Sequence, residues 1–214
     1  MKKSSYLNAT TMSAAFTSLC IILFSISCSK EQSSIAPPPP PPPPPPQSIS
    51  VSLFSGQVPT DTTQNDNYGN GIVLGLKFRT NIAGTIDGLR FYKTHGNAGE
   101  HVGLLYSVDG TLLASAAFTN ETDTGWQTAT LSQPVSISVN TTYIGAYYSS
   151  LGNYVSTNYG LKNAVTNPPL TALADSTDGP NGLFKYTSSF LMPDQGYMSN
   201  NYWVDVILTY QKSE

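Results

Sequence analysis

Histidine, the side chain that most often serves as a catalytic base or a metal ligand, is rare in this chain. His95 and His101 are the only histidines, and they flank a loop that contains Gly96 and Gly99. Nucleophilic catalysis needs a base beside the nucleophile and a third group that orients the base, yet no Gly-x-Ser-x-Gly turn is present. The two histidines also lack the i, i+4 spacing of a helical zinc motif. We therefore expect them in a loop and at a strand end.

The carboxylates give little more support for catalysis. A glycosidase needs two carboxyl groups roughly 5–10 Å apart across a cleft. Glu121 and Asp123 are close in the sequence, but they fall in a predicted turn, where acidic residues are common. We therefore predict that the protein is not an enzyme. Converging carboxylates, or a histidine paired with an acid in a pocket, would instead support an enzyme of unrecognised type.

Aromatic and amide side chains are far more abundant, and 13 of the 214 residues are tyrosines. Sugar binding uses aromatic faces to cover the C–H groups of a pyranose ring, and amides or carboxylates to bond its hydroxyls. The predicted ligand-binding residues, which share one stretch of the chain, are Tyr148, Tyr154, Tyr159, Asp175, Asp178, Asn181, Phe184 and Tyr186, with Asn153, Asn158 and Tyr197 among them. The alternative is that these aromatics only pack the stretch against the domain.

Two acidic clusters suggest structural calcium, which takes about 6–8 oxygen ligands. One cluster contains Asp61 and Asp66, followed by Asn67, and the other contains Asp175 and Asp178, followed by Asn181. Neither matches an EF-hand loop. Calcium is therefore the only cofactor that the sequence suggests, and none is certain.

Period-2 alternation of apolar residues indicates the strands that must position these side chains. The predicted strands are 72–78, 86–92, 102–107, 111–118, 126–130, 135–139, 143–148 and 202–210. Asp109-Gly110 predicts a hairpin turn, and Pro134 separates two strands because a central strand would not tolerate it. No run of helical period and length appears. The fold class is therefore all-β, a single β-sandwich or jelly roll.

Several residues in the predicted strands are assigned to the interior. Trp126 and Trp203 lie within strands, and we expect both in the core. Arg90 and Asp205 also lie in strands, and we expect them to form a buried pair that fixes the pairing of their strands. The stretches 57–71 and 151–200 lack clear alternation. Loops this long are usually functional or disordered, but the aromatic residues in the second stretch favour an ordered, packed segment.

The N-terminal region predicts export. Lys2 and Lys3 precede a short apolar stretch, and Ser27-Cys28 follow it, which is typical of a secretory signal. The ending resembles a bacterial lipobox, although Ser25 stands where an aliphatic residue is usual. We therefore predict a lipoprotein signal peptide at 1–27 and lipidation of Cys28. An ordinary cleaved signal and an uncleaved anchor are the alternatives.

Residues 28–47 are predicted to be a tether. Pro37 to Pro46 is an unbroken run of prolines, which adopts polyproline II and rises about 3.1 Å per residue. Ser29-Lys30-Glu31-Gln32 resembles the export tag of surface-exposed lipoproteins of the Bacteroidota. The predicted location is therefore the outer membrane, lipid-anchored, at the cell surface, with the lipid as the only membrane contact. The periplasmic face is the alternative.

The remaining residues, 48–214, are predicted to form one domain. Only 11% of the chain is charged, with 10 basic and 13 acidic residues and no basic run. This balance argues against a nucleic-acid partner. Cys20 leaves with the signal and Cys28 carries the lipid, so disulfides have no role.

Nine blocks resemble a known family. They are LFSG (53–56), GLKFR (75–79), GTIDGLRFYK (84–93), FTNET (118–122), GWQ (125–127), NTTY (140–143), ALAD (172–175), DGPNG (178–182) and NYWVDV (201–206). Together they resemble the domain of unknown function 4082 family from about Leu53 to Thr209. The resemblance implies a β-sandwich of secreted bacterial proteins, often beside Ig-like or glycoside hydrolase domains, with an accessory, carbohydrate-related role. It implies no catalytic residue.

The sequence therefore leads to a surface-anchored lipoprotein with a non-catalytic binding module, carbohydrate-binding or adhesive, whose partner is a glycan or a cell-envelope protein. The alternative is a structural, protein-interaction module of the cell envelope with no small ligand. Exposed aromatics gathered on one surface would favour the first, and a broad apolar patch with those aromatics buried would favour the second.

Overall fold

The computed structural model describes residues 39–43, 45–60, 63–65 and 69–212. The chain divides into two compact units, 1–43 and 44–214. In the first unit, 39–43 have no regular secondary structure and are exposed. Cys28, Asp61 and Asp66, for which lipidation or calcium binding is predicted, lie outside the described residues.

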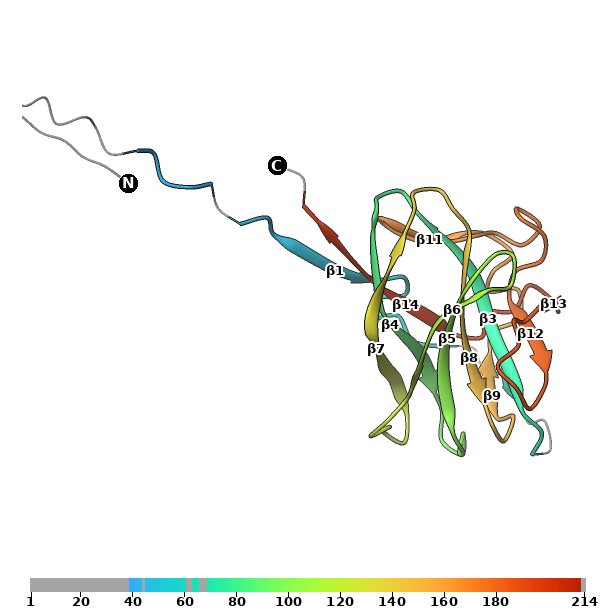
Figure 1. Ribbon diagram of the computed structural model, residues 1–214. Helices are drawn as coiled ribbons and strands as arrows, with labels where there is room; N and C mark the ends of the chain where they lie inside the picture. Colours follow the sequence, from blue (N-terminus) through green and yellow to red (C-terminus); the bar gives the residue numbers. More distant parts are fainter. Residues whose placement is uncertain (1–38, 44, 61–62, 66–68, 213–214) are drawn as a thin grey trace, which may run out of the picture. The chain divides into compact units, whose positions relative to one another are not determined.

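The second unit contains a four-stranded antiparallel sheet (Figure 1). Its strands, in spatial order, are β1 (Ser48–Ser52), β14 (Val204–Gln211), β4 (Gly84–Lys93) and β7 (Gly125–Ile137). β14 therefore lies between β1 and β4, so the first and last strands of the domain are hydrogen-bonded to each other.

A larger antiparallel sheet packs against the first. Its main path is β10 (Val165–Asn167), β11 (Leu170–Ala172), β3 (Ile72–Thr80), β8 (Tyr143–Ser149), β5 (His101–Ser107) and β6 (Leu112–Ala117). Short strands β12 (Leu183–Tyr186) and β13 (Gln195–Gly196) complete it, and a separate pair joins β2 (Thr63–Asn65) to β9 (Tyr154–Ser156). The all-β sandwich predicted from alternation is confirmed.

The stretch 151–200 is ordered because it pairs with one strand twice. β11 pairs with one end of β3, where Leu170 lies opposite Thr80. β12 pairs with the other end, where Tyr186 lies opposite Ile72. The prediction of a packed segment is therefore correct, and the segment forms short strands rather than a free loop.

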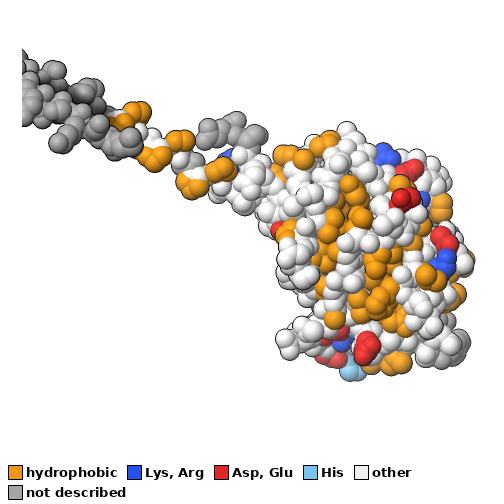
Figure 2. Space-filling view, in the orientation of Figure 1, with side chains coloured by type: hydrophobic (Ala, Val, Ile, Leu, Met, Phe, Trp, Pro, Cys, Tyr) orange, Lys and Arg blue, Asp and Glu red, His pale blue; other side chains and the backbone are white. Residues whose placement is uncertain are grey.

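The apolar side chains of β3 alternate between the two faces of the larger sheet. Leu74 and Leu76 belong to the main core between the sheets. Val73, one residue away, belongs to a second cluster with Leu104 and Ile144, because neighbouring side chains of a strand point to opposite faces. Figure 2 shows hydrophobic side chains gathered on the visible face over β3, β5, β6 and β8. The larger sheet is therefore apolar on both faces.

Arg90 and Asp205 form the predicted buried pair, opposite each other in β4 and β14. Arg90 Nη1 lies 3.3 Å from Asp205 Oδ2, and the Asp205 side chain is fully buried. Its carboxylate also accepts hydrogen bonds from the backbone amides of Leu53 and Phe54. Arg90 stacks over Trp126 at 4.4 Å. Burial raises the pKa of Asp205, and Arg90 with the backbone donors opposes this rise. The buried pair therefore holds the segment that follows β1 against the four-stranded sheet.

Two sequence predictions about strands are wrong. Pro134 does not separate two strands, because β7 runs continuously through it. β7 is an edge strand and its register shifts near this point, and both features tolerate proline. The last strand starts at Val204 rather than Tyr202, because Trp203 has φ 54°, which an extended strand excludes.

Other local predictions are confirmed. Gly110 has φ 93° in the turn between β5 and β6, so Asp109-Gly110 forms the predicted hairpin. Trp203 is 8% exposed and packs in the main core, whereas Trp126 is only partly buried at its edge. No helix in the described part of the chain is long and apolar enough to span a membrane.

Candidate functional site

A hollow of about 340 Å³, here called the tyrosine pocket, opens among three separate segments of the chain. Its walls come from β9 and the turn after it, from β12, and from the residues that precede β14. It is lined by Tyr154, Ser156, Asn158, Phe184, Tyr186, Tyr197, Met198, Asn200 and Tyr202. Five of these nine side chains are aromatic, so the pocket offers several ring faces to a ligand.

Backbone hydrogen bonds hold two of the walls together. Thr157 and Asn201 exchange a pair of N–H to O bonds, each 2.9 Å long. The amide of Tyr159 donates to Met198 O at 2.9 Å. Trp203 Nε1 donates to Thr157 Oγ1 at 2.9 Å. The segment before β14 is therefore tied to the segment after β9 by main-chain contacts, which fix the lining side chains.

The backbone beside the pocket is conformationally unusual. Met198, Ser199 and Trp203 have φ values of 51°, 47° and 54°, in the left-handed region that non-glycine residues rarely occupy. A side chain at Gly182 would lie 2.0 Å from Asn200 O, so only glycine permits this close approach. Such conformations tend to cluster at binding and catalytic sites, and they indicate that the shape of this segment is tightly specified.

The rings of the pocket pack edge to face. Tyr154 and Tyr202 have centroids 5.7 Å apart at 72°, and Phe184 and Tyr186 have centroids 5.5 Å apart at 65°. These are favourable geometries for aromatic pairs. Tyr186 is 57% exposed and Tyr197 is 61% exposed. The pocket therefore combines inner rings held by their neighbours with outer rings open to solvent.

The tyrosine pocket is electrically neutral. None of its lining residues is Asp, Glu, Lys, Arg or His. Burial raises the pKa of the Tyr202 hydroxyl to about 12. Burial also raises the pKa of Tyr154, and the nearby hydroxyl of Tyr186 adds to this rise. Both phenols are therefore protonated hydrogen-bond donors at neutral pH.

One polar atom in the pocket lining has no hydrogen-bond partner within the described part of the chain. Asn200 is 4% exposed, and its Oδ1 atom is buried without a donor. A buried acceptor left unpaired costs about 1–3 kcal/mol. The Asn200 side chain also bonds to the Tyr202 hydroxyl, so it holds that ring in the wall of the pocket.

The pocket gathers part of the predicted ligand-binding set. Tyr154, Phe184 and Tyr186 line it, together with Asn158 and Tyr197, which were also considered. The other four lining residues, which the sequence did not indicate as ligand-binding, are Ser156, Met198, Asn200 and Tyr202. Tyr202 was assigned to the last strand. The only sequence signal for a binding role was its position beside other aromatic and amide residues.

Two predicted tyrosines do not line the pocket. Tyr148, on β8, packs edge to face on Phe190 with centroids 5.4 Å apart. Tyr159 is 57% exposed but lies outside the lining. Tyr159 therefore provides an exposed tyrosine with which the lining tyrosines can be compared.

Asp175, Asp178 and Asn181 do not line the pocket either, because they organise the loop before β12. Asp178 Oδ2 accepts from Thr142 Oγ1 at 2.6 Å and pairs with Arg79 at 3.2 Å. Asp175 accepts from the amide of Asn181 at 2.9 Å. Asn181 is 1% exposed and donates to Leu173 O at 2.7 Å. Hydrogen bonds lower the pKa of both carboxyls, for Asp175 chiefly that from Asn181 and for Asp178 chiefly that from Thr142.

The predicted calcium ligands divide between described and undescribed residues. Asp61 and Asp66 lie outside the described residues. Asp175 and Asp178 already accept bonds from protein donors. Among the described residues, no group of three or more His, Cys, Asp or Glu side chains is arranged to hold a metal ion. Structural calcium stays a prediction.

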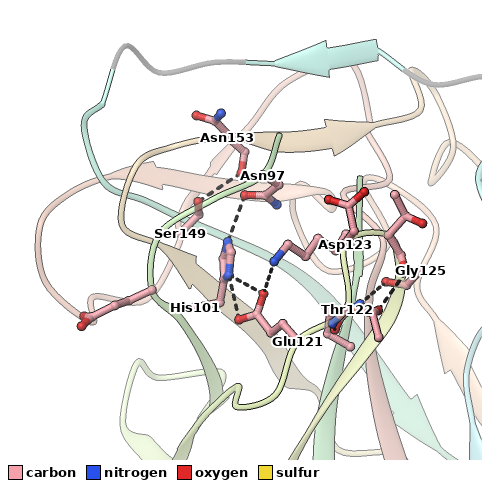
Figure 3. Close-up of polar contacts among 12 residues, drawn as sticks. Asn97, His101, Glu121, Thr122, Asp123, Gly125, Ser149 and Asn153 are labelled. Carbon is pink, nitrogen blue, oxygen red and sulfur yellow. Dashed lines mark hydrogen bonds and ion pairs between the residues drawn. The ribbon is translucent and has the colours of Figure 1, made fainter. Parts of the chain in front are cut away.

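A second polar region, here called the His101 cluster, joins the ends of β4 and β5 to the turn before β7 (Figure 3). His101 Nδ1 lies 3.0 Å from both carboxylate oxygens of Glu121, and its Nε2 lies 2.9 Å from Asn97 Oδ1. Lys93 Nζ donates to Glu121 at 2.7 Å. Each of the charged groups is therefore neutralised or bonded within the cluster.

The His101 cluster is closed to solvent at its centre. The His101 side chain is fully buried, and those of Glu121 and Lys93 are 13% and 15% exposed. Burial lowers the pKa of His101, and this outweighs the opposite effect of Glu121. A histidine paired with an acid is therefore present at a strand end, but it does not line the tyrosine pocket. His95 lies in the loop before β5, as predicted, and forms an exposed pair with Asp123.

The model of one protein family matches residues 56–204 of the chain, and this family is described as "Domain of unknown function (DUF4082)". The match covers the strands of both sheets except β1 and most of β14, and it includes every residue that lines the tyrosine pocket. No curated protein matches the chain.

Proposed function

The chain belongs to the DUF4082 family, and we propose that it is a surface-anchored lipoprotein whose sandwich domain binds carbohydrate without catalysing a reaction. The observation that carries this proposal is the tyrosine pocket. Five aromatic rings, two asparagines and a serine line one neutral hollow. Apolar ring faces and uncharged hydrogen-bonding groups match the two kinds of surface that a sugar ring presents.

The electrostatics support binding rather than catalysis. Hydrolysis of a glycosidic bond needs two carboxyl groups at the site, and the pocket lining contains none. The histidine and acid that are paired lie in the His101 cluster, where the imidazole is fully buried. Ring faces and hydroxyl donors without an ionisable group are suited to holding a sugar.

The pocket lies within the folded domain, away from the strand with which the domain begins. Tyr202 lines the pocket just before β14, and Gln211 at the end of β14 pairs with Ser48, where β1 begins. At about 3.3 Å per residue, the chain between Tyr202 and Gln211 covers up to roughly 30 Å. The pocket and Ser48 therefore lie toward opposite ends of β14.

The proposed anchor is a lipid on Cys28, and the proposed location is the outer membrane with the domain at the cell surface. The signal-like N-terminus, Ser27-Cys28 and the proline run support it. Mass spectrometry of the full-length protein from membranes should find an acylated peptide that begins at Cys28. Recovery of a chain with unmodified Cys28 in the soluble fraction would contradict the anchor.

The carbohydrate proposal is tested by a glycan array with the mature chain, produced with Cys28→Ser, with calcium and again with chelator. We expect binding that Tyr186→Ala abolishes, while the matched change Tyr159→Ala leaves it intact. Both tyrosines are 57% exposed, so the pair separates loss of a pocket ring from loss of any surface tyrosine. Loss of binding in chelator would add calcium to the site.

A second candidate function is a protein-interaction module without a small ligand. It is favoured by the apolar side chains near the β5–β6 hairpin, where Val108, Leu112 and Leu113 are 50%, 42% and 37% exposed. Exposed apolar patches mark interaction surfaces more often than chance. A folded chain that binds no glycan, with or without calcium, would reject the first function and leave this one.

A further inference from the structure

We propose that the site continues across Tyr186 into a second hollow and that its ligand is an uncharged sugar chain of at least two units, bound along its length. This inference rests on the proposed function. A hollow of about 420 Å³ is lined by Asn70, Gly71, Tyr186, Thr187 and Ser188. Tyr186 also lines the tyrosine pocket, so one exposed ring belongs to the walls of both hollows.

The second hollow, here called the Ser188 hollow, is formed where β12 leaves the sheet. Tyr186, the last residue of β12, pairs with Ile72 of β3. The next residue, Thr187, donates its amide to Gly71 O at 3.0 Å. The residues after Tyr186 and those before Ile72 therefore lie side by side, and the hollow continues the line of the tyrosine pocket past the end of the strand.

Gly71, which lines the Ser188 hollow, allows the segments beside it to pack closely. A side chain there would begin 2.5 Å from Thr187 O and 2.6 Å from Tyr148 Oη, closer than real contacts allow. Tyr148, one of the predicted ligand-binding residues, therefore packs against Gly71, although it lines neither hollow.

The size of the two hollows favours a chain over a single sugar. Small-molecule sites usually enclose about 300–1,000 Å³, and each hollow alone, at about 340 and 420 Å³, is near the lower limit. Because Tyr186 lines both hollows, a chain that spans them would contact this exposed residue along more of its length than a single sugar would.

The charge of the lining selects against acidic sugars. Neither hollow is lined by Lys, Arg or His, so a uronate carboxylate would lose hydration without gaining a cation, which is costly. The amide and hydroxyl groups of both linings are uncharged, and each neutral sugar unit carries hydroxyls that can exchange hydrogen bonds with them. Uncharged oligosaccharides therefore match the whole lining.

The test measures affinity against chain length by titration calorimetry with the mature chain. The probes are cello-, manno- and xylo-oligosaccharides of one to six units, and oligogalacturonates of the same lengths. For the neutral type that binds, we expect affinity to rise about tenfold or more from one unit to four, where tenfold is about 1.4 kcal/mol. Oligogalacturonates should not bind.

Two matched variants assign the gain in affinity to the Ser188 hollow. Ser188→Gln adds an uncharged side chain at an exposed residue of the lining, and it should remove the gain with length while leaving the shortest ligand unaffected. Ser189→Gln makes the same change one residue further on, outside the lining, and should do neither.

The outcomes separate the two proposals. Affinity that does not depend on length, or a gain with length that Ser188→Gln leaves intact, would overturn the two-hollow site and keep a carbohydrate-binding pocket. Tighter binding of oligogalacturonates than of neutral chains would overturn the uncharged ligand. Failure of a folded chain to bind any of the probes or any glycan on the array would overturn both proposals.

Discussion

The tyrosine pocket and the His101 cluster are both built from polar side chains brought together from distant strands, yet they use them in opposite ways. In the cluster, Lys93, His101 and Glu121 bond to one another and are largely buried. In the pocket the lining is uncharged, two rings are more than half exposed, and the Asn200 carbonyl lacks a donor among the described residues. The charged groups of the cluster therefore pair with one another, whereas the pocket presents uncharged rings and amides to solvent.

This difference shows why reactive residue types are a poor guide to the site in this domain. A buried charge is stable only when it is paired, so the charged residues of the interior bond to one another and stabilise the fold. Tyrosine and asparagine can stay partly exposed without that constraint, and they remain available to a ligand. The comparison predicts that changes in the cluster alter stability, and that changes in the pocket alter binding.

The largest effect is expected from Glu121→Ala. The change leaves Lys93 and His101 without their carboxylate partner in a mostly buried region, and breaking such a buried pair costs about 3–5 kcal/mol. Denaturant unfolding would measure the loss. Glu121→Gln keeps a hydrogen-bond acceptor and should lose less. A stability equal to that of the wild type would show that the cluster is not structural.

The next-largest effects are expected from two buried asparagines, Asn97 and Asn200, which are 2% and 4% exposed. Replacing the first should change stability, and replacing the second should change binding. Asn97→Ala removes a partner of the His101 ring and should lower stability by about 1–3 kcal/mol without changing glycan affinity. Asn200→Ala removes the acceptor in the pocket, so glycan affinity should fall by about tenfold with little change in unfolding. The comparison fails if both variants shift the same property.

A smaller effect is expected from pH. Burial holds the pKa of His101 below its ordinary value of 6.5, so below about pH 6.5 the unfolded chain binds this proton more readily than the folded chain. The free energy of unfolding should therefore fall as pH decreases from about 6.5, while glycan affinity of the folded protein stays constant.

Unfolding curves at pH 7.5 and 5.5 would measure this dependence. His101→Gln is the control, because it removes the buried titrating group and retains His95, whose pKa the exposed Asp123 raises. If the variant shows the same slope with pH as the wild type, the dependence comes from other groups.

The smallest effect is expected from Asp178→Ala, which removes a predicted ligand residue that lies outside both hollows. Its pair with Arg79 is more than one third exposed on each side, and such pairs contribute about 0–1 kcal/mol. Stability should change within that range and glycan affinity should not change. A loss of affinity comparable with that of Tyr186→Ala would place the site on this loop instead.

Much of the fold could be predicted from the sequence, because alternation and turn residues act over short distances. Leu74, Leu76 and Phe78 indicated β3, and Asp109-Gly110 indicated the β5–β6 hairpin. Pro134 was misread because the rule that excludes proline applies to central strands, and edge position is decided by pairing partners far along the chain. Trp203 was wrongly included in the last strand, because the pattern of apolar residues does not indicate a positive φ.

The candidate site could be predicted only in part. The concentration of aromatic and amide residues correctly singled out the stretch that contains Tyr154, Phe184 and Tyr186. Composition alone could not distinguish these three residues from Tyr148 and Tyr159, because it does not show which side chains of a stretch line the same pocket.

By itself, the sequence determined the all-β class, the family, and the stretch of chain in which the pocket lies, because these depend on residue type and local spacing. Only the tertiary structure decided which side chains meet. β3 pairs with β11 and β12 in succession, and the segment before β14 bonds to the segment after β9. These contacts close loops of many residues, so they depend on burial and pairing across the whole domain, which no local pattern encodes.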